Sequence, residues 1–298
     1  MLAAVAAAVA LACHPAPGLG TLAYPSHGVV HVVDLSTCRT QTTHAVWPAG
    51  PRPVLESPDG RYRVSAHLHT LVVTNVRTHL SADVFHADSP VIVAGWSPDS
   101  RWILFAVDPM GSASLAADGL ELQAVTADGR RTVAIAPTLM YADYRAWCGR
   151  DLVLTTGGNR LATAGKSLTL VRPGTWSLRP LVRERLAWGS VVCASDGRSV
   201  VVQAQPPTDP LNLTFNRANW ALWRVGFDGT SRKLTSPPHG YSDDSPLVVG
   251  RTIFFVRSHR GAGLVYALRD GRVLGPFARL GPDSGFYGHH TWPYSVTP

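Results

Sequence analysis

The sequence predicts an all-β protein, a six-bladed β-propeller whose blades are four-stranded antiparallel sheets. Three observations carry this prediction: a unit that recurs at roughly the blade period of a propeller, Asp-Gly hairpin turns between apolar residues, and two chain ends that complement each other. The 298 residues are 45% hydrophobic and 16% charged. This composition supplies a large core and excludes a disordered chain.

Each unit begins with a tight turn that leads into an apolar run. Ser57-Pro58-Asp59-Gly60-Arg61 precedes one such run, Trp96-Ser97-Pro98-Asp99-Ser100-Arg101 precedes the next, and degenerate copies follow near residues 148, 196 and 250. Pro, Asp and Gly favour turns, and β-branched and aromatic runs favour strands. A catalytic residue is needed once, so we interpret the repeated residues as structural turn residues: Asp59, Gly60, Asp99, Asp196 and Gly197.

The second half of a unit carries its own hairpin signal. Turns at 127–130, 227–230 and 269–271 contain Asp-Gly between alternating apolar residues, which is a strong short-range signal for a β-hairpin. Together with the two strands around the first turn, this makes four antiparallel strands per blade.

The two ends of the chain each supply part of a blade. In each unit a short apolar strand precedes the first turn, and we call it the lead strand. Gly20–Ala45 contains three predicted strands but no lead strand, whereas Gly288–Pro293 resembles a lead strand that is not followed by further strands. We therefore predict that the C-terminal strand completes the first blade and leaves no open sheet edge. Residues 20–298 then form one propeller domain.

These motifs resemble the repeat of the TolB-like propellers, in which a Trp-Ser-Pro-Asp-Gly turn precedes a strand and an Asp-Gly hairpin ends in Leu-Thr. The match is best over 221–258, which carries the hairpin, Leu234-Thr235 and the lead-in Asp244-Ser245-Pro246. Asp88-Ser89-Pro90 is a second copy of the lead-in. The resemblance covers nearly all of 20–298 and implies the six-bladed fold. It implies little about activity, because such repeats serve scaffolds, sensors and the propeller domains of peptidases.

The N-terminal residues indicate export. Leu2–Ala12 is an unbroken apolar run, too short to span a bilayer and typical of a signal peptide. We therefore assign residues 1–13 to a signal and expect a location outside the cytoplasm. Cys13 follows Ala10-Leu11-Ala12 as in a bacterial lipobox, which makes it a candidate for lipidation. Secretion without a lipid anchor and a cytosolic chain with an unusual N-terminus remain as alternatives.

Export would allow the cysteines to form disulfides, because the compartments outside the cytoplasm are oxidising. Cys148 and Cys193 occupy nearly equivalent positions of adjacent repeats, just before the turn after each lead strand. We predict a disulfide between them, which leaves Cys38 unpaired if Cys13 is removed or lipidated. Two buried free thiols, or mispairing with Cys38, are the alternatives.

Catalytic motifs are absent from the sequence. It contains no Gly-x-Ser-x-Gly elbow, no glycine-rich phosphate loop and no His-Glu-x-x-His. The net charge of +7 comes from scattered arginines, without the basic stripe that nucleic-acid binding requires.

Candidate ligands for a metal lie at the blade entrances and near the chain end. Asp88, Asp243 and Asp244 precede lead strands, and His289 and His290 lie near the proposed C-terminal strand. Carboxylates and imidazoles around one mouth of the central tunnel could bind a divalent cation. The structural alternative is that the aspartates satisfy backbone N–H groups in turns. We expect His67 and His69, two apart in a strand, to face solvent.

Two long segments, 108–118 and 205–219, interrupt strands that a short turn should join. Long loops on rigid scaffolds often carry binding sites, and the alternative is a loop that packs on its own blade.

The sequence thus favours an exported, non-catalytic scaffold that binds a protein or ligand in the cell envelope or outside the cell. We expect a monomer without a transmembrane span and without a cofactor beyond the cation considered above. The alternative function is a small-molecule hydrolase or lyase with a metal site at the tunnel mouth.

Overall fold

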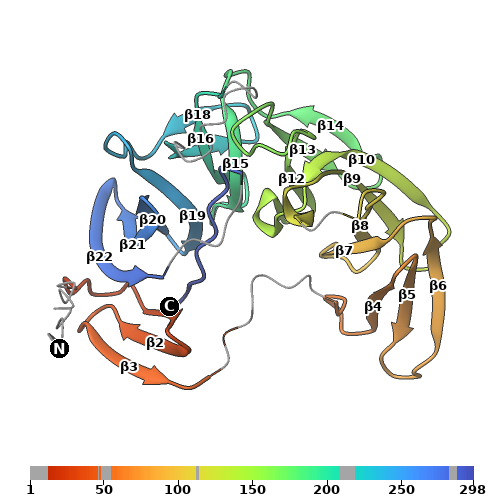
Figure 1. The fold of residues 1–298 in the computed structure, drawn as a ribbon, viewed down its shortest axis with the longest axis horizontal. Coiled ribbons are helices and arrows are strands. Elements are labelled where there is room, and N and C mark those ends of the chain that lie inside the picture. Colours follow the sequence, from red (N-terminus) through yellow and green to blue (C-terminus); the bar gives the residue numbers. More distant parts are fainter. Residues whose placement is uncertain (1–12, 46, 48–54, 112–113, 209–218, 282–286) are drawn as a thin grey trace, which may run out of the picture.

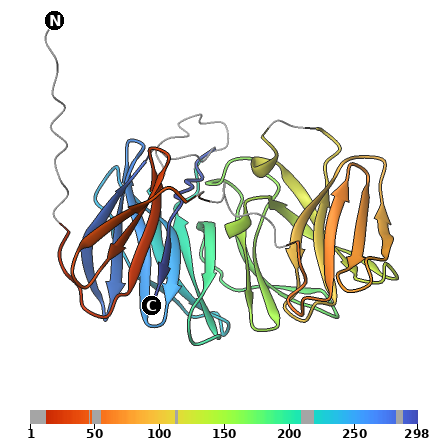
Figure 2. The ribbon, with the colours of Figure 1, turned by 90° about the horizontal axis from the view of Figure 1, so that it is seen from below.

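Six β-sheets stand around a central axis in the computed structural model (Figure 1). The structure describes residues 13–45, 47, 55–111, 114–208, 219–281 and 287–298. The strands run along the axis in side view (Figure 2), and the described helices are two short 3-10 turns, Leu115–Ala117 and Ala142–Tyr144. The predicted all-β, six-bladed propeller is confirmed. No helix among these residues has the length and apolarity needed to cross a membrane.

The blades follow the chain in order, and in blades 2 to 6 the first strand of each sheet lies nearest the axis (Figure 1). Blade 1 contains β1 (Thr21–Ser26), β2 (Val29–Asp34), β3 (Arg39–Thr43) and the last strand, β23 (Ser295–Thr297). Blade 2 contains β4 (Tyr62–His67), β5 (Thr70–Asn75) and β6 (Ser81–His86). Blade 3 contains β7 (Val91–Trp96), β8 (Trp102–Val107), β9 (Gly119–Thr126) and β10 (Thr132–Leu139).

The second half of the ring is built in the same way. Blade 4 contains β11 (Arg145–Cys148), β12 (Asp151–Thr156), β13 (Ser167–Arg172) and β14 (Ser177–Pro180). Blade 5 contains β15 (Ala187–Cys193), β16 (Ser199–Gln205), β17 (Ala221–Gly226) and β18 (Ser231–Lys233). Blade 6 contains β19 (Ser242–Val249), β20 (Thr252–His259), β21 (Ala262–Arg269) and β22 (Arg272–Leu280).

The repeated turns connect strands and also link blades. The Asp59 carboxylate accepts hydrogen bonds from Ser57 Oγ at 2.6 Å and from the Arg61 amide at 3.1 Å. Gly60 adopts a φ of +70°, and Ser100 occupies the matching position of the next turn at +59°. The Ser100 hydroxyl accepts a hydrogen bond from the Asp59 amide at 3.1 Å. A serine at this strained position therefore ties the turn of blade 3 to that of blade 2.

The predicted completion of blade 1 by the C-terminal strand is confirmed. β23 pairs antiparallel with β1, and Val296 stands opposite Leu22. The paired strand begins at Ser295, so residues 288–293 are not the lead strand that we predicted; they approach it without regular structure. Val296 lies in a buried cluster with Leu22 of blade 1 and with Phe254 and Val265 of blade 6.

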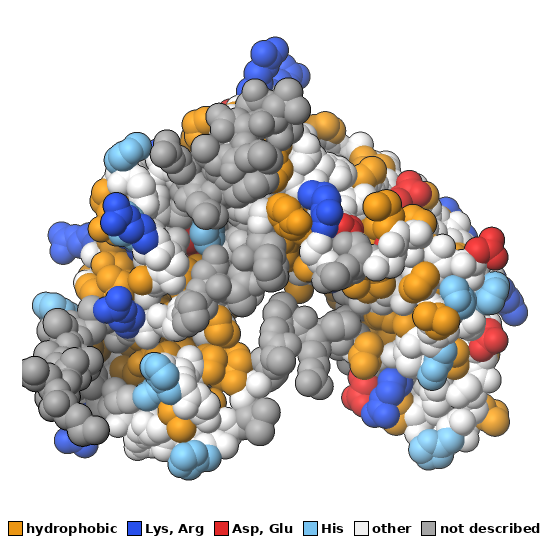
Figure 3. Space-filling model, viewed as in Figure 1, with side chains coloured by type: hydrophobic (Ala, Val, Ile, Leu, Met, Phe, Trp, Pro, Cys, Tyr) orange, Lys and Arg blue, Asp and Glu red, His pale blue; other side chains and the backbone are white. Residues whose placement is uncertain are grey.

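Buried apolar clusters join five pairs of neighbouring blades: 2 and 3, 3 and 4, 4 and 5, 5 and 6, and 6 and 1. The described residues form no such cluster between blades 1 and 2, which stand apart in Figures 1 and 3. Several residues of blade 2 that alternate with the clustered ones are polar: Ser65 bonds His67 at 2.9 Å, Thr70 bonds His86 at 3.2 Å, and Thr74 bonds Ser81 at 2.8 Å. Strand β23 thus completes the sheet of blade 1, while the described residues show no apolar cluster between blades 1 and 2.

Blade 2 also departs from the predicted four strands. Its described sheet has three strands in the order β4-β5-β6. An isolated antiparallel bridge between Glu56 and Arg63 stands where a fourth strand would pair. Residues 48–54, just before this bridge, lie outside the described residues.

Two disulfides cross-link the chain. Cys148 of β11 is bonded to Cys193 of β15, with the Cα atoms 5.5 Å apart, which links blades 4 and 5 near the axis. Cys13 is bonded to Cys38 in the β2–β3 turn, with the Cα atoms 5.8 Å apart. An unpaired Cys38 was expected for a chain whose Cys13 is removed or lipidated; with Cys13 present, the two cysteines pair. In this state the Cys13 sulfur is not available for the thioether bond that lipidation requires. Residues 1–12 of the predicted signal lie outside the described residues.

We expect Val296→Asp to lower the free energy of unfolding by on the order of 3 kcal/mol, because it puts an unpaired carboxylate into the core between blades 1 and 6. The neighbouring Thr297→Asp is the matched control, since Thr297 is exposed, and should change stability by less than about 0.5 kcal/mol. Guanidinium denaturation measures both. Equal effects of the two variants would show that β23 does not contribute to this core.

We expect replacement of both Cys148 and Cys193 by Ser to cost about 4 kcal/mol of stability, because the bond closes a loop with a sequence separation of 45. Denaturation with and without reductant measures the loss, and non-reducing peptide mapping identifies the pairs. Free thiols at both positions in oxidised protein, or a cross-link from either one to Cys38, would contradict this pairing.

Candidate functional site

A cavity of about 750 Å³ lies at the centre of the ring. The inner strands supply Ile92 and Val93 from β7, Ser190 and Val191 from β15, and 245–247 from β19. The two 3-10 turns and the start of β11 add Leu115, Ala116, Ala142, Asp143 and Arg145, and the connecting segments add Trp47, Met140, Tyr141, Thr291, Trp292, Pro293 and Tyr294. The wall is mostly apolar and aromatic, with few polar groups, as in small-molecule and peptide pockets.

Asp143 is the central polar group of this cavity. The short 3-10 turn Ala142–Tyr144 places it before β11. Its carboxylate accepts hydrogen bonds from Ser190 Oγ at 2.6 Å and from His289 Nε2 at 2.9 Å. The His289 side chain is 2% exposed and that of Asp143 is 36% exposed. The imidazole is therefore enclosed, while part of the carboxylate remains open to a ligand.

Two tyrosines hold the His289 ring in place. The Tyr141 ring stacks on it with a centroid separation of 3.8 Å, and the Tyr144 ring lies at 5.5 Å. Complete burial raises the pKa of the Tyr144 hydroxyl well above its usual value, so this phenol is neutral at physiological pH. The aromatic enclosure fixes the orientation of the imidazole toward Asp143.

Arg145 adds a positive charge beside the cavity. Its guanidinium donates hydrogen bonds to the carbonyl oxygens of Tyr141 and Ala94, each at 3.1 Å. Burial lowers the pKa of Arg145 to about 10, although the Asp143 charge opposes this shift. Because this value lies well above neutral pH, the guanidinium stays charged and partly balances the carboxylate.

The contacts among Ser190, Asp143 and His289 differ from those of a Ser-His-Asp triad. Ser190 donates its proton to Asp143, and His289 bonds the other carboxylate oxygen. The carboxylate thus stands between the serine and the histidine, whereas a catalytic triad places the histidine between the serine and the acid. The arrangement can hold a carboxylate in a fixed position, which suits recognition of a ligand.

The predicted tunnel-mouth aspartates have structural roles in the fold. Asp243 is fully buried and forms a bidentate ion pair with Arg257 at 2.7 and 2.9 Å. The buried Asp244 carboxylate accepts hydrogen bonds from Gln203 at 3.0 Å and from Ser258. Gln203 belongs to blade 5, so these contacts tie blade 5 to blade 6. Both carboxylates thus have partners within the protein, as in the structural alternative, and their role as ligands at the tunnel mouth stays a prediction.

The other predicted ligands are also dispersed. Asp88 is exposed in the bend between β6 and β7, and His290 is half-buried beside His289. Of the five candidates, His289 bonds Asp143, which lines the cavity. The described residues contain no group of three or more His, Cys, Asp or Glu side chains that could hold a metal ion. His67 is exposed as expected, but His69 lies in the β4–β5 turn and not in the strand.

The described parts of both long loops contact the blade 4 loop between β12 and β13. Asp118, at the end of the 108–118 segment, forms an ion pair with Arg160 of blade 4 at 3.2 Å. Thr163 of the same blade 4 loop bonds Thr208 at 2.6 Å, and the Ala162 amide donates to the Tyr287 carbonyl oxygen at 2.9 Å. The first segment thus packs across blades and not only on its own blade. Most of the second segment, 209–218, lies outside the described residues.

Sequence comparison gives no relative: no family model and no curated protein matches the chain. Solved structures do match. The structure of a putative TolB from Agrobacterium tumefaciens has a TM-score of 0.50 and 13% identity, over 94% of this chain and 100% of that one. A puromycin hydrolase has a TM-score of 0.54 and 14% identity, over 94% of this chain.

The TolB of Acinetobacter baumannii matches 85% of this chain with a TM-score of 0.46 and 15% identity. This chain spans 62% of that TolB and 54% of the puromycin hydrolase. At such identities the likeness concerns the fold alone, and the fold agrees with the repeat motifs. The chain therefore has the fold of the TolB-like six-bladed β-propellers.

Proposed function

We propose that this chain is an exported, non-catalytic binding module whose ligand enters the axial cavity. The observation that carries the proposal is the cavity itself, in which an apolar and aromatic wall surrounds the partly exposed Asp143 carboxylate. A ligand with an apolar body and a positively charged group fits this chemistry. A basic peptide segment with an aromatic or aliphatic side chain is the partner that we favour.

The polar groups of the cavity are organised before a ligand arrives. Ser190 and His289 bond the Asp143 carboxylate, and two backbone carbonyl oxygens hold Arg145. Fixed groups lose little conformational freedom on binding, so more of the apolar burial appears as affinity. Catalysis is less well supported, because the hydroxyl of Ser190 is directed to a carboxylate and not to a histidine.

Export is supported by the signal-like N-terminus and by the two disulfides, which persist in oxidising compartments. The fold alone does not distinguish a binding module from an enzyme, since solved structures with this fold include both a putative TolB and a puromycin hydrolase.

Site-specific cross-linking in the exporting cell tests the proposal. We expect a photoreactive amino acid at Leu115, in the cavity wall, to give a discrete adduct. The same amino acid at Leu80, an apolar residue that is 73% exposed in the β5–β6 turn, is the matched control and should give none. Adducts that are absent at Leu115, or identical at both positions, would overturn the proposal.

Asp143→Asn should reduce the Leu115 adduct at least tenfold while the melting temperature changes little, because the amide keeps the shape of the side chain but removes the charge. An undiminished adduct would show that the carboxylate does not take part in recognition.

A further inference from the structure

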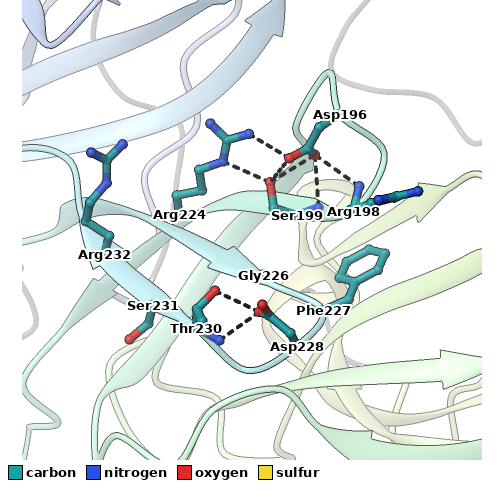
Figure 4. Close-up of a pocket in the computed structure, with 10 residues that line it drawn as sticks. All are labelled: Asp196, Arg198, Ser199, Arg224, Gly226, Phe227, Asp228, Thr230, Ser231 and Arg232. Carbon is teal, nitrogen blue, oxygen red and sulfur yellow. Dashed lines mark hydrogen bonds and ion pairs between the residues drawn. The ribbon is translucent and has the colours of Figure 1, made fainter.

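Two further cavities lie away from the axis, at the outer part of blade 5. Each has a volume of about 590 Å³. One is formed around the β17–β18 hairpin and is drawn in Figure 4, and the other lies between blades 5 and 6. Both are lined by Arg224 and Arg232, whose guanidinium groups project to the same side of the hairpin in Figure 4.

The cavity between the blades is strongly basic. Arg224, Arg232 and Lys233 come from blade 5 and Arg251 comes from the β19–β20 turn of blade 6, and we call these four residues the basic cleft. Asp270 is the one carboxylate that lines this cavity within the described part of the chain, and it pairs with Arg251 at 3.1 Å. The cleft therefore carries an excess of positive charge.

Arg224 and Arg232 stand directly opposite each other in the β17–β18 pair. Like charges at such positions repel each other and destabilise a sheet. Asp196 offsets only one of them, since its carboxylate accepts a hydrogen bond from Arg224 at 2.7 Å and Ser199 Oγ accepts another from Arg224 Nε at 2.9 Å. Among the residues that the structure describes, neither Arg232 nor Lys233 has an ion pair.

Two further carboxylates near the pair accept other hydrogen bonds: Glu184 from Ser231 Oγ, and Asp228 within its own turn. Asp228 accepts hydrogen bonds from the Thr230 amide at 3.0 Å and from Thr230 Oγ1 at 2.7 Å. Figure 4 shows the Asp228 carboxylate directed toward Thr230, below the guanidinium groups. Because Arg232 has no ion pair among the described residues, an anion from outside the chain would offset the repulsion between Arg224 and Arg232.

We propose that the basic cleft binds a phosphate or sulfate group between Arg224 and Arg232. Guanidinium groups present paired N–H donors that match the oxygens of such anions. Arg224 uses Nε and one Nη within the protein, which leaves its other Nη for the ligand. A doubly charged oxyanion bound there would cancel the cross-strand repulsion. The cavity volume leaves room for the molecule that carries the anion.

Thermal unfolding and calorimetric titration with inorganic phosphate and sulfate test this site, with chloride added to keep the ionic strength constant. We expect saturable binding and a rise in melting temperature. Arg232→Gln should weaken binding at least tenfold. Without the anion it should be as stable as the wild type or more stable, because the like-charge pair is gone. Arg130→Gln is the matched control, since Arg130 is exposed on blade 3 and its loss changes the net charge equally.

A phosphate monoester, glycerol 3-phosphate, distinguishes the source of the anion. Tighter binding of the ester indicates a phosphate carried by an organic molecule, and equal binding indicates the free anion. The proposal is overturned if neither ligand binds saturably at constant ionic strength. It is also overturned if Arg232→Gln and Arg130→Gln respond to the anions in the same way.

Discussion

Blade 1 depends on a strand from the opposite end of the chain. Three residue pairs join β1 to β23, and the resulting sheet packs on blade 6 through a shared apolar cluster. A blade is a thin sheet that cannot bury both faces alone, so it needs a neighbour. Because the described part of blade 1 shares no apolar cluster with blade 2, its attachment rests on blade 6 and on the β23 pairing.

The segment before β1 adds to this attachment. The Cys13–Cys38 disulfide fixes it to blade 1, and Arg269 of blade 6 donates weak hydrogen bonds to the carbonyl oxygens of Pro17 and Gly18, each at 3.4 Å. Both ends of the chain therefore hold blade 1 against blade 6. The same C-terminal segment supplies 291–294 to the cavity wall, and Tyr294 donates a hydrogen bond to the Ser245 carbonyl oxygen at 2.6 Å. The C-terminal segment thus completes the sheet of blade 1 and also forms part of the cavity wall.

Local patterns made most of the fold predictable. Asp-Gly turns and β-branched runs act over a few residues, so the hairpins and the strands of blade 1 could be placed from the sequence. The cavity could not, because Asp143 meets Ser190 and His289 across separations of 47 and 146 residues. The residues that flank Asp143 in the sequence do not form a recognisable binding or catalytic motif. The partners of Asp243 and Asp244 were also not readable from the sequence, since Arg257 lies on the neighbouring strand β20 and Gln203 lies in blade 5.

Hydrogen exchange of the backbone amides is the most direct test of this account. The pairing of β23 with β1 predicts that a peptide covering 295–297 exchanges about as slowly as peptides from β1 and β2. It also predicts that Val296→Asp accelerates exchange in β23 and β1 together. Exchange of 295–297 at the rate of an unstructured peptide, while β2 stays protected, would contradict the completion of blade 1 by the C-terminal strand.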